Sequence, residues 1–177
     1  MVQSWDTGLS DEPTADYSVC TTWGYRDRFW HLLDVTRERF AYPDLKRAVL
    51  RQHRIWKPDC VLIEDAGTGK ALWQELRSSD VLRPIMWEVT EDKETRLIGV
   101  TGQLEEGLCL LPAEAPWLEA FRQELRAFPF GRHDDQVDSM TQFLQYHIWR
   151  GRSLLAERDE TGRLLRIDRP TRRSRMR

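Results

Sequence analysis

The first forty residues carry the short-period hydrophobic pattern that is typical of β-strands. Apolar and aromatic residues dominate segments 2–6 and 16–23, and a turn-rich stretch over 7–14 separates the two. Segment 29–36 has the two-residue period of a strand, with one side formed by Phe29, His31, Leu33 and Val35. The pattern therefore predicts three successive antiparallel strands.

The pattern then alternates between helices and strands. A helix is predicted from Tyr42-Pro43, because proline is tolerated in a first turn, to the residue before Lys57-Pro58. Segment 60–63 is a continuous apolar run, which is typical of a parallel strand covered on both faces. The rest predicts a helix from 67 through Leu76, a strand in 81–89, an interrupted helix in 91–106, a short strand in 108–111, a helix in 116–128 and a last helix in 135–149. This order indicates an α/β fold in which a mixed sheet, three antiparallel strands and then parallel strands, is flanked by helices.

Composition supports a folded domain and shows an uneven distribution of charge. The 177 residues are 40% hydrophobic and 32% charged, a balance that excludes collagen-like, coiled-coil and wholly disordered chains. The net charge of −2 hides a C-terminal stretch, 162–177, that has seven arginines and one acid. We therefore expect a globular domain over 1–150 and a basic tail over 151–177.

Neither the cysteines nor the hydrophobic runs point to export. Cys20, Cys60 and Cys109 form no CxxC pair and lie in or beside apolar runs, so buried free thiols are expected. No stretch approaches the roughly 20 apolar residues of a membrane span, and the N-terminus does not resemble a signal peptide. These features predict a cytoplasmic protein without a membrane partner.

Acidic residues occur at three places where they can gather into one site. Asp6 ends the first strand, Glu64-Asp65 follows the buried strand, and a last group surrounds the start of the final helix. Ligands of α/β sheets bind at the carboxyl ends of strands, and carboxylates that share a pocket need a cation to neutralise them. Hard oxygen ligands select Mg²⁺ or Mn²⁺. The last group consists of His133, Asp134, Asp135 and Asp138.

Each of these residues also has a simpler structural role when taken alone. Asp134 before a helix is an N-cap by default, and acids in a first turn favourably oppose the helix dipole. Taken alone, Asp6 is explained as the start of a turn and Glu64 as a solvated strand end. His133 taken alone is explained as a surface or structural residue. The conjunction of the three places is what indicates chemistry.

The glycine-rich turn after the buried strand is not a nucleotide-binding loop. Gly67-Thr-Gly69-Lys70 resembles the end of a P-loop, but the pattern needs glycine and a hydroxyl residue where this chain has Glu64 and Ala71. No ATPase is therefore expected in this chain. The glycines instead let the backbone leave the strand sharply beside the acids.

Together, these motifs resemble the nuclease domain of the large terminase subunit of tailed bacteriophages. The resemblance covers roughly residues 1–149, and Lys93-x-x-Arg96 and Glu105-Glu-Gly107 are similar to the linking segment of that family. It implies a ribonuclease H-like fold and a metal-dependent endonuclease that cuts concatemeric viral DNA during packaging. The motifs that carry it are Ser4-Trp-Asp-Thr7, Asp16-Tyr-Ser-Val19, the run 61–69 and His133-Asp-Asp-Gln-Val-Asp138.

The resemblance also implies roles for the acidic residues. Asp6 matches the first-strand aspartate, and Glu64 matches the acid of the fourth strand, with Asp65 as the adjacent candidate. The third acid is Asp135 or its neighbour Asp134, and we prefer Asp135. In a two-metal mechanism with Mg²⁺ or Mn²⁺, our hypothesis is that Asp6 bridges the ions while Glu64 and Asp135 complete their shells. His133 either orients the water or the leaving group, or only packs.

Contacts with DNA must come from basic residues. Residues 1–161 carry more acids than bases, and a surface with excess negative charge binds duplex DNA poorly. Lys93 and Arg96 are candidate backbone contacts, and so are Arg47, Arg51 and Arg54, although on helices these residues equally well form solvated faces. The arginines of the tail, Arg172 and Arg173 among them, either grip DNA or dock on an acidic portal or small-subunit surface.

The implied partners are double-stranded DNA, the portal protein, the small terminase subunit and a packaging ATPase domain, in the cytoplasm of a host bacterium. Large terminases of the family carry that ATPase in the same chain, so this sequence is expected to be an isolated domain, a separately encoded piece or a prophage remnant. Two other functions stay open. One is another ribonuclease H-like nuclease, such as a resolvase or a transposase core. The other is a non-catalytic module that docks on portal or terminase partners.

Overall fold

A computed structural model describes residues 1–8, 12, 14–79 and 81–156, and only the backbone of 152–156. The chain divides into two compact units, Met1–Gln145 and Tyr146–Arg177. Most of the predicted basic tail, including Arg172 and Arg173, lies outside the described residues.

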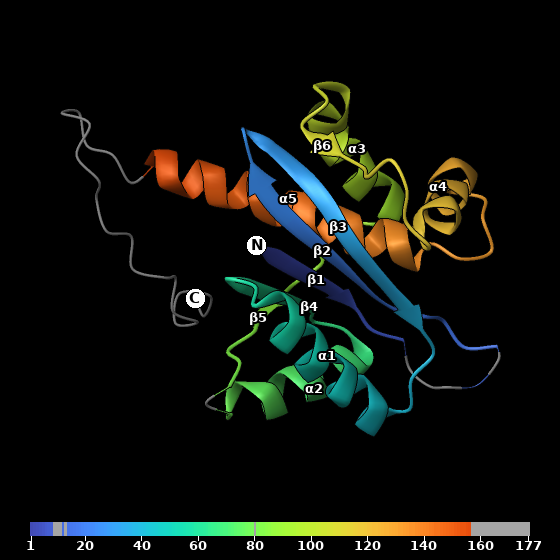
Figure 1. The fold of residues 1–177 in the computed structure, drawn as a ribbon, viewed down its shortest axis with the longest axis vertical. Helices are drawn as coiled ribbons and strands as arrows, with labels where there is room; N and C mark the ends of the chain where they lie inside the picture. Colours follow the sequence, from blue (N-terminus) through green and yellow to red (C-terminus); the bar gives the residue numbers. More distant parts are fainter. Residues whose placement is uncertain (9–11, 13, 80, 157–177) are drawn as a thin grey trace, which may run out of the picture. The chain divides into compact units, whose positions relative to one another are not determined.

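The strands form one six-stranded mixed sheet with the order β5-β4-β1-β2-β3-β6 (Figure 1). The first three strands pair antiparallel, whereas β4 pairs parallel with both β1 and β5, and β6 pairs parallel with β3. The predicted mixed sheet is thus confirmed. The strands are β1 Val2–Asp6, β2 Ser18–Arg26, β3 Phe29–Glu38, β4 Cys60–Glu64, β5 Ile85–Trp87 and β6 Cys109–Leu110.

The helices connect and cover these strands. They are α1 Tyr42–Trp56, α2 Gly67–Arg77, α3 Lys93–Glu105, α4 Leu118–Ala127 and α5 Asp135–Ala156. Within the described residues, none of them combines the length and the apolar character that crossing a bilayer requires.

The apolar core lies between the sheet and the α1–α2 pair. Trp5 and Ile63 project from β1 and β4 and pack with apolar residues of the two helices, all almost fully buried. Burying this much apolar surface is the main force that holds the two helices on the sheet. The helical residues of the core include Leu45, Val49, Leu72 and Leu76.

A buried polar seam joins α5 to the other face of the sheet. The Ser139 hydroxyl donates to the Ser4 carbonyl oxygen at 2.8 Å and lies 2.8 Å from the Thr21 hydroxyl oxygen. The Gln142 side-chain amide donates to the Ser4 hydroxyl at 2.9 Å. Because each hydrogen bond has one geometry, this seam fixes how far α5 is rotated and shifted along β1 and β2.

α5 is more enclosed than its hydrophobic period predicts. The pattern places Val137, Met140 and Leu144 inward, whereas every residue from 135 to 144 is buried in the structure. The sheet contacts one side of the helix, where Phe143 stacks on Trp23 with ring centroids 4.5 Å apart. Side chains of α3 and α4 also contact the first turns of α5, as described below. A helix covered on several sides loses the amphipathic signal.

Three predicted elements differ from the structure. The helix predicted as interrupted in 91–106 is the continuous helix α3. The alternation over 29–36 is interrupted by a β-bulge, because Thr22 pairs with Asp34 while Trp23 pairs with Leu32. Leu33 is therefore an extra residue and is exposed, whereas Leu32 is buried. The last helix continues past the expected end at Trp149 to Ala156.

The second unit begins within α5. The rings of Tyr146 and Trp149 lie 6.0 Å apart, and the Arg150 guanidinium donates to the Tyr146 hydroxyl oxygen at 3.3 Å. Aromatic and polar contacts between successive turns support this part of the helix.

We expect Ser139→Ala to lower the free energy of unfolding by about 1–3 kcal/mol, because the buried Ser4 carbonyl and Thr21 hydroxyl each lose a partner. Urea unfolding followed by circular dichroism measures the change. Ser78→Ala is the matched control, since the hydroxyl of this exposed serine donates to the Glu75 carbonyl oxygen within its own helix end. Equal effects of the two substitutions would show that the seam contributes nothing special.

Candidate active site

Asp6 and Glu64 lie side by side at the carboxyl ends of two parallel strands. The register pairs Trp5 with Ile63, so the next residue of each strand reaches the same edge of the sheet. Burial, followed by the charge of Glu64, raises the pKa of Asp6 well above its ordinary value, and a hydrogen bond with the Glu64 side chain acts in the same direction. The Asp6 carboxyl group therefore keeps its proton to a higher pH than an ordinary aspartate does.

The turn after β4 aims Glu64, and not Asp65, at Asp6. The Asp65 amide donates to the Trp87 carbonyl oxygen at 2.8 Å, and its carboxylate lies 3.6 Å from the Lys70 ammonium. A Cβ at Gly69 would lie 2.3 Å from the Glu64 carbonyl oxygen, so only glycine fits there. The expectation that these glycines allow a sharp exit from the strand is confirmed.

α5 brings two further carboxylates to Asp6. Asp135 and Asp138 are three residues apart on one side of the helix, both are buried, and the charge of each raises the pKa of Asp6. Asp138 lay in the predicted acidic group, but no metal-binding or catalytic role was predicted for it. Its spacing from Asp135 is the signal that would have included it, once the helix is known to face β1.

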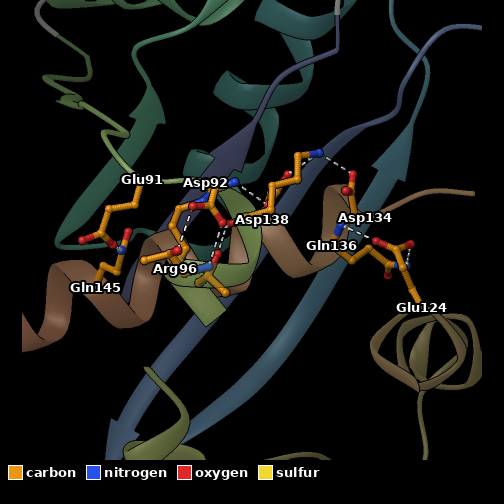
Figure 2. Close-up of polar contacts among 11 residues, drawn as sticks. Glu91, Asp92, Arg96, Glu124, Asp134, Gln136, Asp138 and Gln145 are labelled. Atoms are coloured by element: carbon orange, nitrogen blue, oxygen red, sulfur yellow. Dashed lines mark hydrogen bonds and ion pairs between the residues drawn. The ribbon is translucent and has the colours of Figure 1, made fainter. Parts of the chain in front are cut away.

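Two cations of α3 hold Asp138 (Figure 2). Arg96 Nη2 lies 2.5 Å from Asp138 Oδ1, and Lys93 Nζ lies 3.0 Å from Asp138 Oδ2. Burial raises the pKa of Asp138, against the charges of Arg96 and Lys93, which act to lower it. Arg96 is only 3% exposed, so the structure leaves Lys93, and not Arg96, accessible for the predicted contact with DNA.

Asp135 lacks such compensation. Burial first, and then the charge of Glu124, raises its pKa to about 6. Its Oδ2 atom is buried without a hydrogen-bond partner in the described part of the chain. The His133 ring is nearby, but its Nδ1 lies 3.9 Å from that oxygen, beyond hydrogen-bond distance. The charge of Arg37 lowers the pKa of Asp135 only in part.

The N-terminus of α5 is capped by another helix and not by the predicted residue. Glu124 of α4 accepts hydrogen bonds from the Gln136 backbone amide at 2.6 Å and from the Gln136 side chain at 2.5 Å (Figure 2). The Asp134 carboxylate, expected to cap the helix or bind metal, instead lies 2.6 Å from Lys93 Nζ. No sequence pattern singles out Glu124, because its role depends on how α4 and α5 meet.

His133 lies at the rim of the acidic group. Its ring contacts Tyr17 edge-on with centroids 5.1 Å apart. Burial, followed by the charges of Arg37, Arg132 and Arg39, lowers its pKa, so the ring is neutral at physiological pH. A neutral imidazole beside Asp135 is compatible with either predicted role, orienting a reactant or packing.

The carboxylates of the described residues do not form a complete metal-binding group. Across residues 1–8, 12, 14–79 and 81–156, no three His, Cys, Asp or Glu side chains are arranged so that they could hold a metal ion. The predicted Asp6–Glu64 pair is formed, whereas Asp65 and Asp134 face Lys70 and Lys93.

Comparisons with known proteins agree with this architecture. Residues 3–147 match the family model described as the terminase RNaseH-like domain. The large terminase of the thermophilic bacteriophage D6E is similar in structure, with a TM-score of 0.62 and 14% identity over 83% of this chain and 40% of that chain. This chain thus spans less than half the length of that terminase.

A second similar structure is the Fowlpox virus resolvase in complex with its substrate, Holliday junction DNA. The TM-score is 0.52, with 14% identity over 82% of this chain and 97% of that chain. No relative is found among the curated proteins. The predicted ribonuclease H-like fold is confirmed, and the chain belongs to the terminase RNaseH-like domain family.

Proposed function

We propose that this domain is a metal-dependent endonuclease that cuts concatemeric viral double-stranded DNA during genome packaging, in the cytoplasm of a host bacterium. The observation that carries the proposal is the meeting of Asp6 and Glu64 at the ends of β1 and β4, with Asp135 and Asp138 of α5 close enough to raise the pKa of Asp6. Membership in a terminase family supports the viral context.

The chemistry of this group fits Mg²⁺ or Mn²⁺. Burial and the charges of Glu64, Asp138 and Asp135 raise the pKa of Asp6, and a bound cation would offset this repulsion between the carboxylates. Asp135 Oδ2 is buried and unpartnered within the described residues. We therefore assign Asp6, Glu64 and Asp135 as the ligands, where two bound ions would supply activation of the attacking water and stabilisation of the leaving 3′ oxygen.

Asp138, Lys93 and Arg96 serve a different purpose in this proposal. Asp138 is already neutralised by two cations, so its carboxylate is poorly available to a metal. The three residues tie α3 to the start of α5 and so hold Asp135 at the sheet edge. They are positioning residues.

Partners follow from the family and not from the geometry. We propose double-stranded DNA as the substrate, and the portal protein, the small terminase subunit and a packaging ATPase domain as the assembly in which the cut is made. The large terminase that this chain resembles is more than twice as long as the matched region. We therefore assign the packaging ATPase domain to the wider assembly.

A resolvase is the second candidate function. The structural similarity to the Fowlpox virus resolvase, whose structure contains Holliday junction DNA, favours it. The two functions differ in substrate shape. Faster cutting of a four-way junction than of a linear duplex of equal length would favour the resolvase.

We expect Asp6→Asn to reduce plasmid cleavage in Mg²⁺ or Mn²⁺ by about 100-fold or more, because a carboxylate that neutralises the cation is lost. The same substitution is expected to leave the metal-free protein at least as stable as the wild type, since it removes a buried acid beside Glu64. Gel-based digestion and thermal unfolding in a chelator measure the two effects.

Asp27→Asn, at the exposed β2–β3 turn where asparagine tolerates the positive φ, is the control and should cut like the wild type. Wild-type cleavage by Asp6→Asn would contradict the site assignment. A wild-type protein that is inert with both metals would instead support the non-catalytic docking role.

The two acids of α5 should behave differently in thermal unfolding. Asp135→Asn is expected to abolish the rise in melting temperature that Mg²⁺ or Mn²⁺ produces. Asp138→Asn is expected to retain that rise but to lower the free energy of unfolding by about 3–5 kcal/mol, because it leaves the buried Arg96 charge unpaired. The opposite pattern would make Asp138 the ligand and Asp135 the structural acid.

A further inference from the structure

An arginine-lined groove lies beside the end of β3 and one side of α1. These two elements follow each other directly in the chain (Figure 1). Its volume is about 570 Å³. Four guanidinium groups line it, accompanied by two carboxylates. The charged lining residues are Glu38, Arg39, Asp44, Arg47, Arg51 and Arg54.

The arginines of α1 are available to a ligand. Arg47, Arg51 and Arg54 are all exposed, and their spacing of four and three residues places them on one face of the helix. Arg47 pairs with Asp44, whereas Arg54 donates to the Leu50 carbonyl oxygen and has no ion pair in the described part of the chain. Arg51 forms no ion pair within the described residues. Free guanidinium groups in a groove attract anions, and their fork geometry matches phosphate oxygens.

A series of contacts connects this groove to the acidic site. Arg39 lines the groove and also stacks on Tyr17, with its guanidinium carbon 3.7 Å from the ring centroid, as does Arg37. Tyr17 contacts His133, and His133 lies beside Asp135. Arg39, Tyr17 and His133 therefore link the groove to the edge of the sheet where the carboxylates gather.

We propose that this groove binds the phosphate backbone of duplex DNA and holds the segment that flanks the cut. The proposal rests on the proposed nuclease function for the identity of the polymer. Arg47 to Arg54 span about 10 Å along the helix axis, which equals the axial rise of about three phosphates of one strand at 3.4 Å each. An evenly charged polymer matches this row of like charges better than a folded acidic protein does.

The test measures how DNA binding depends on salt. In an Asp6→Asn background with Mg²⁺, the triple variant Arg47→Ala, Arg51→Ala, Arg54→Ala should bind a short labelled duplex more weakly. The slope of log affinity against log salt should fall in magnitude by about 2 to 3, since each phosphate contact contributes about 0.9. Fluorescence anisotropy over a salt series gives both values.

The matched control removes three exposed arginines outside the groove, Arg26→Ala, Arg83→Ala and Arg126→Ala, and so changes net charge equally. Its slope should stay within measurement error of the Asp6→Asn protein. Equal salt slopes for the groove triple variant and the control triple variant would overturn the proposal. The groove would then be assigned to binding an acidic protein surface. Should the groove triple fold poorly by circular dichroism, Arg51→Ala alone, at an exposed position without an ion pair, should lower the slope by about one.

Cleavage kinetics separate this inference from the function on which it rests. In the protein with intact Asp6, the groove triple should raise KM for plasmid DNA several-fold, with a much smaller change in kcat, whereas Asp6→Asn should lower kcat. A wild-type protein that never cuts would defeat the nuclease proposal, yet the binding comparison would still decide whether the groove holds DNA.

Discussion

The hydrogen bonds between α5 and the first two strands are the constraint on which the site depends. Apolar side chains tolerate small rotations of a helix, but Ser139 and Gln142 reach the Ser4 backbone and side chain only in one register. That register turns Asp135 toward the edge where Asp6 meets Glu64. The polar seam therefore sets the geometry of the acids, while the apolar core on the α1–α2 side supplies most of the stability.

Repulsion among the gathered carboxylates destabilises the folded protein, and neighbouring cations offset only part of that effect. Asp138 is neutralised by Arg96 and Lys93, and that ion-pair network joins α3 to α5. Among the described residues, Asp6 and Asp135 form no such pair of contacts with cations, and both have raised pKa values. Such unpaired acids are costly in a core, and a bound cation is the simplest compensation. In the proposed site, the distinction between paired and unpaired acids separates positioning residues from the proposed metal ligands.

The sequence alone predicted the places at which the acids meet but not their partners. Strand ends are readable from hydrophobic runs, so Asp6 and Glu64 could be assigned to one sheet edge before the structure was known. The choice among the acids of α5 depends on the rotation of that helix, which tertiary hydrogen bonds decide. Glu124 as a cap and Leu33 as a bulge residue depend on contacts between elements that are distant in sequence or on one extra residue in a strand. Local periodicity contains neither kind of information.

The central claim is that Asp6, Glu64 and Asp135 together hold the catalytic cation. Anomalous diffraction from crystals soaked in Mn²⁺ tests it most directly, because the ion is located without any assumption about activity. We expect a strong anomalous peak bonded to carboxylate oxygens of Asp6 and Glu64, with Asp135 at the same ion or at a second ion beside it. A peak bonded elsewhere, or an Asp6–Glu64 hydrogen bond that persists in saturating Mn²⁺, would contradict it.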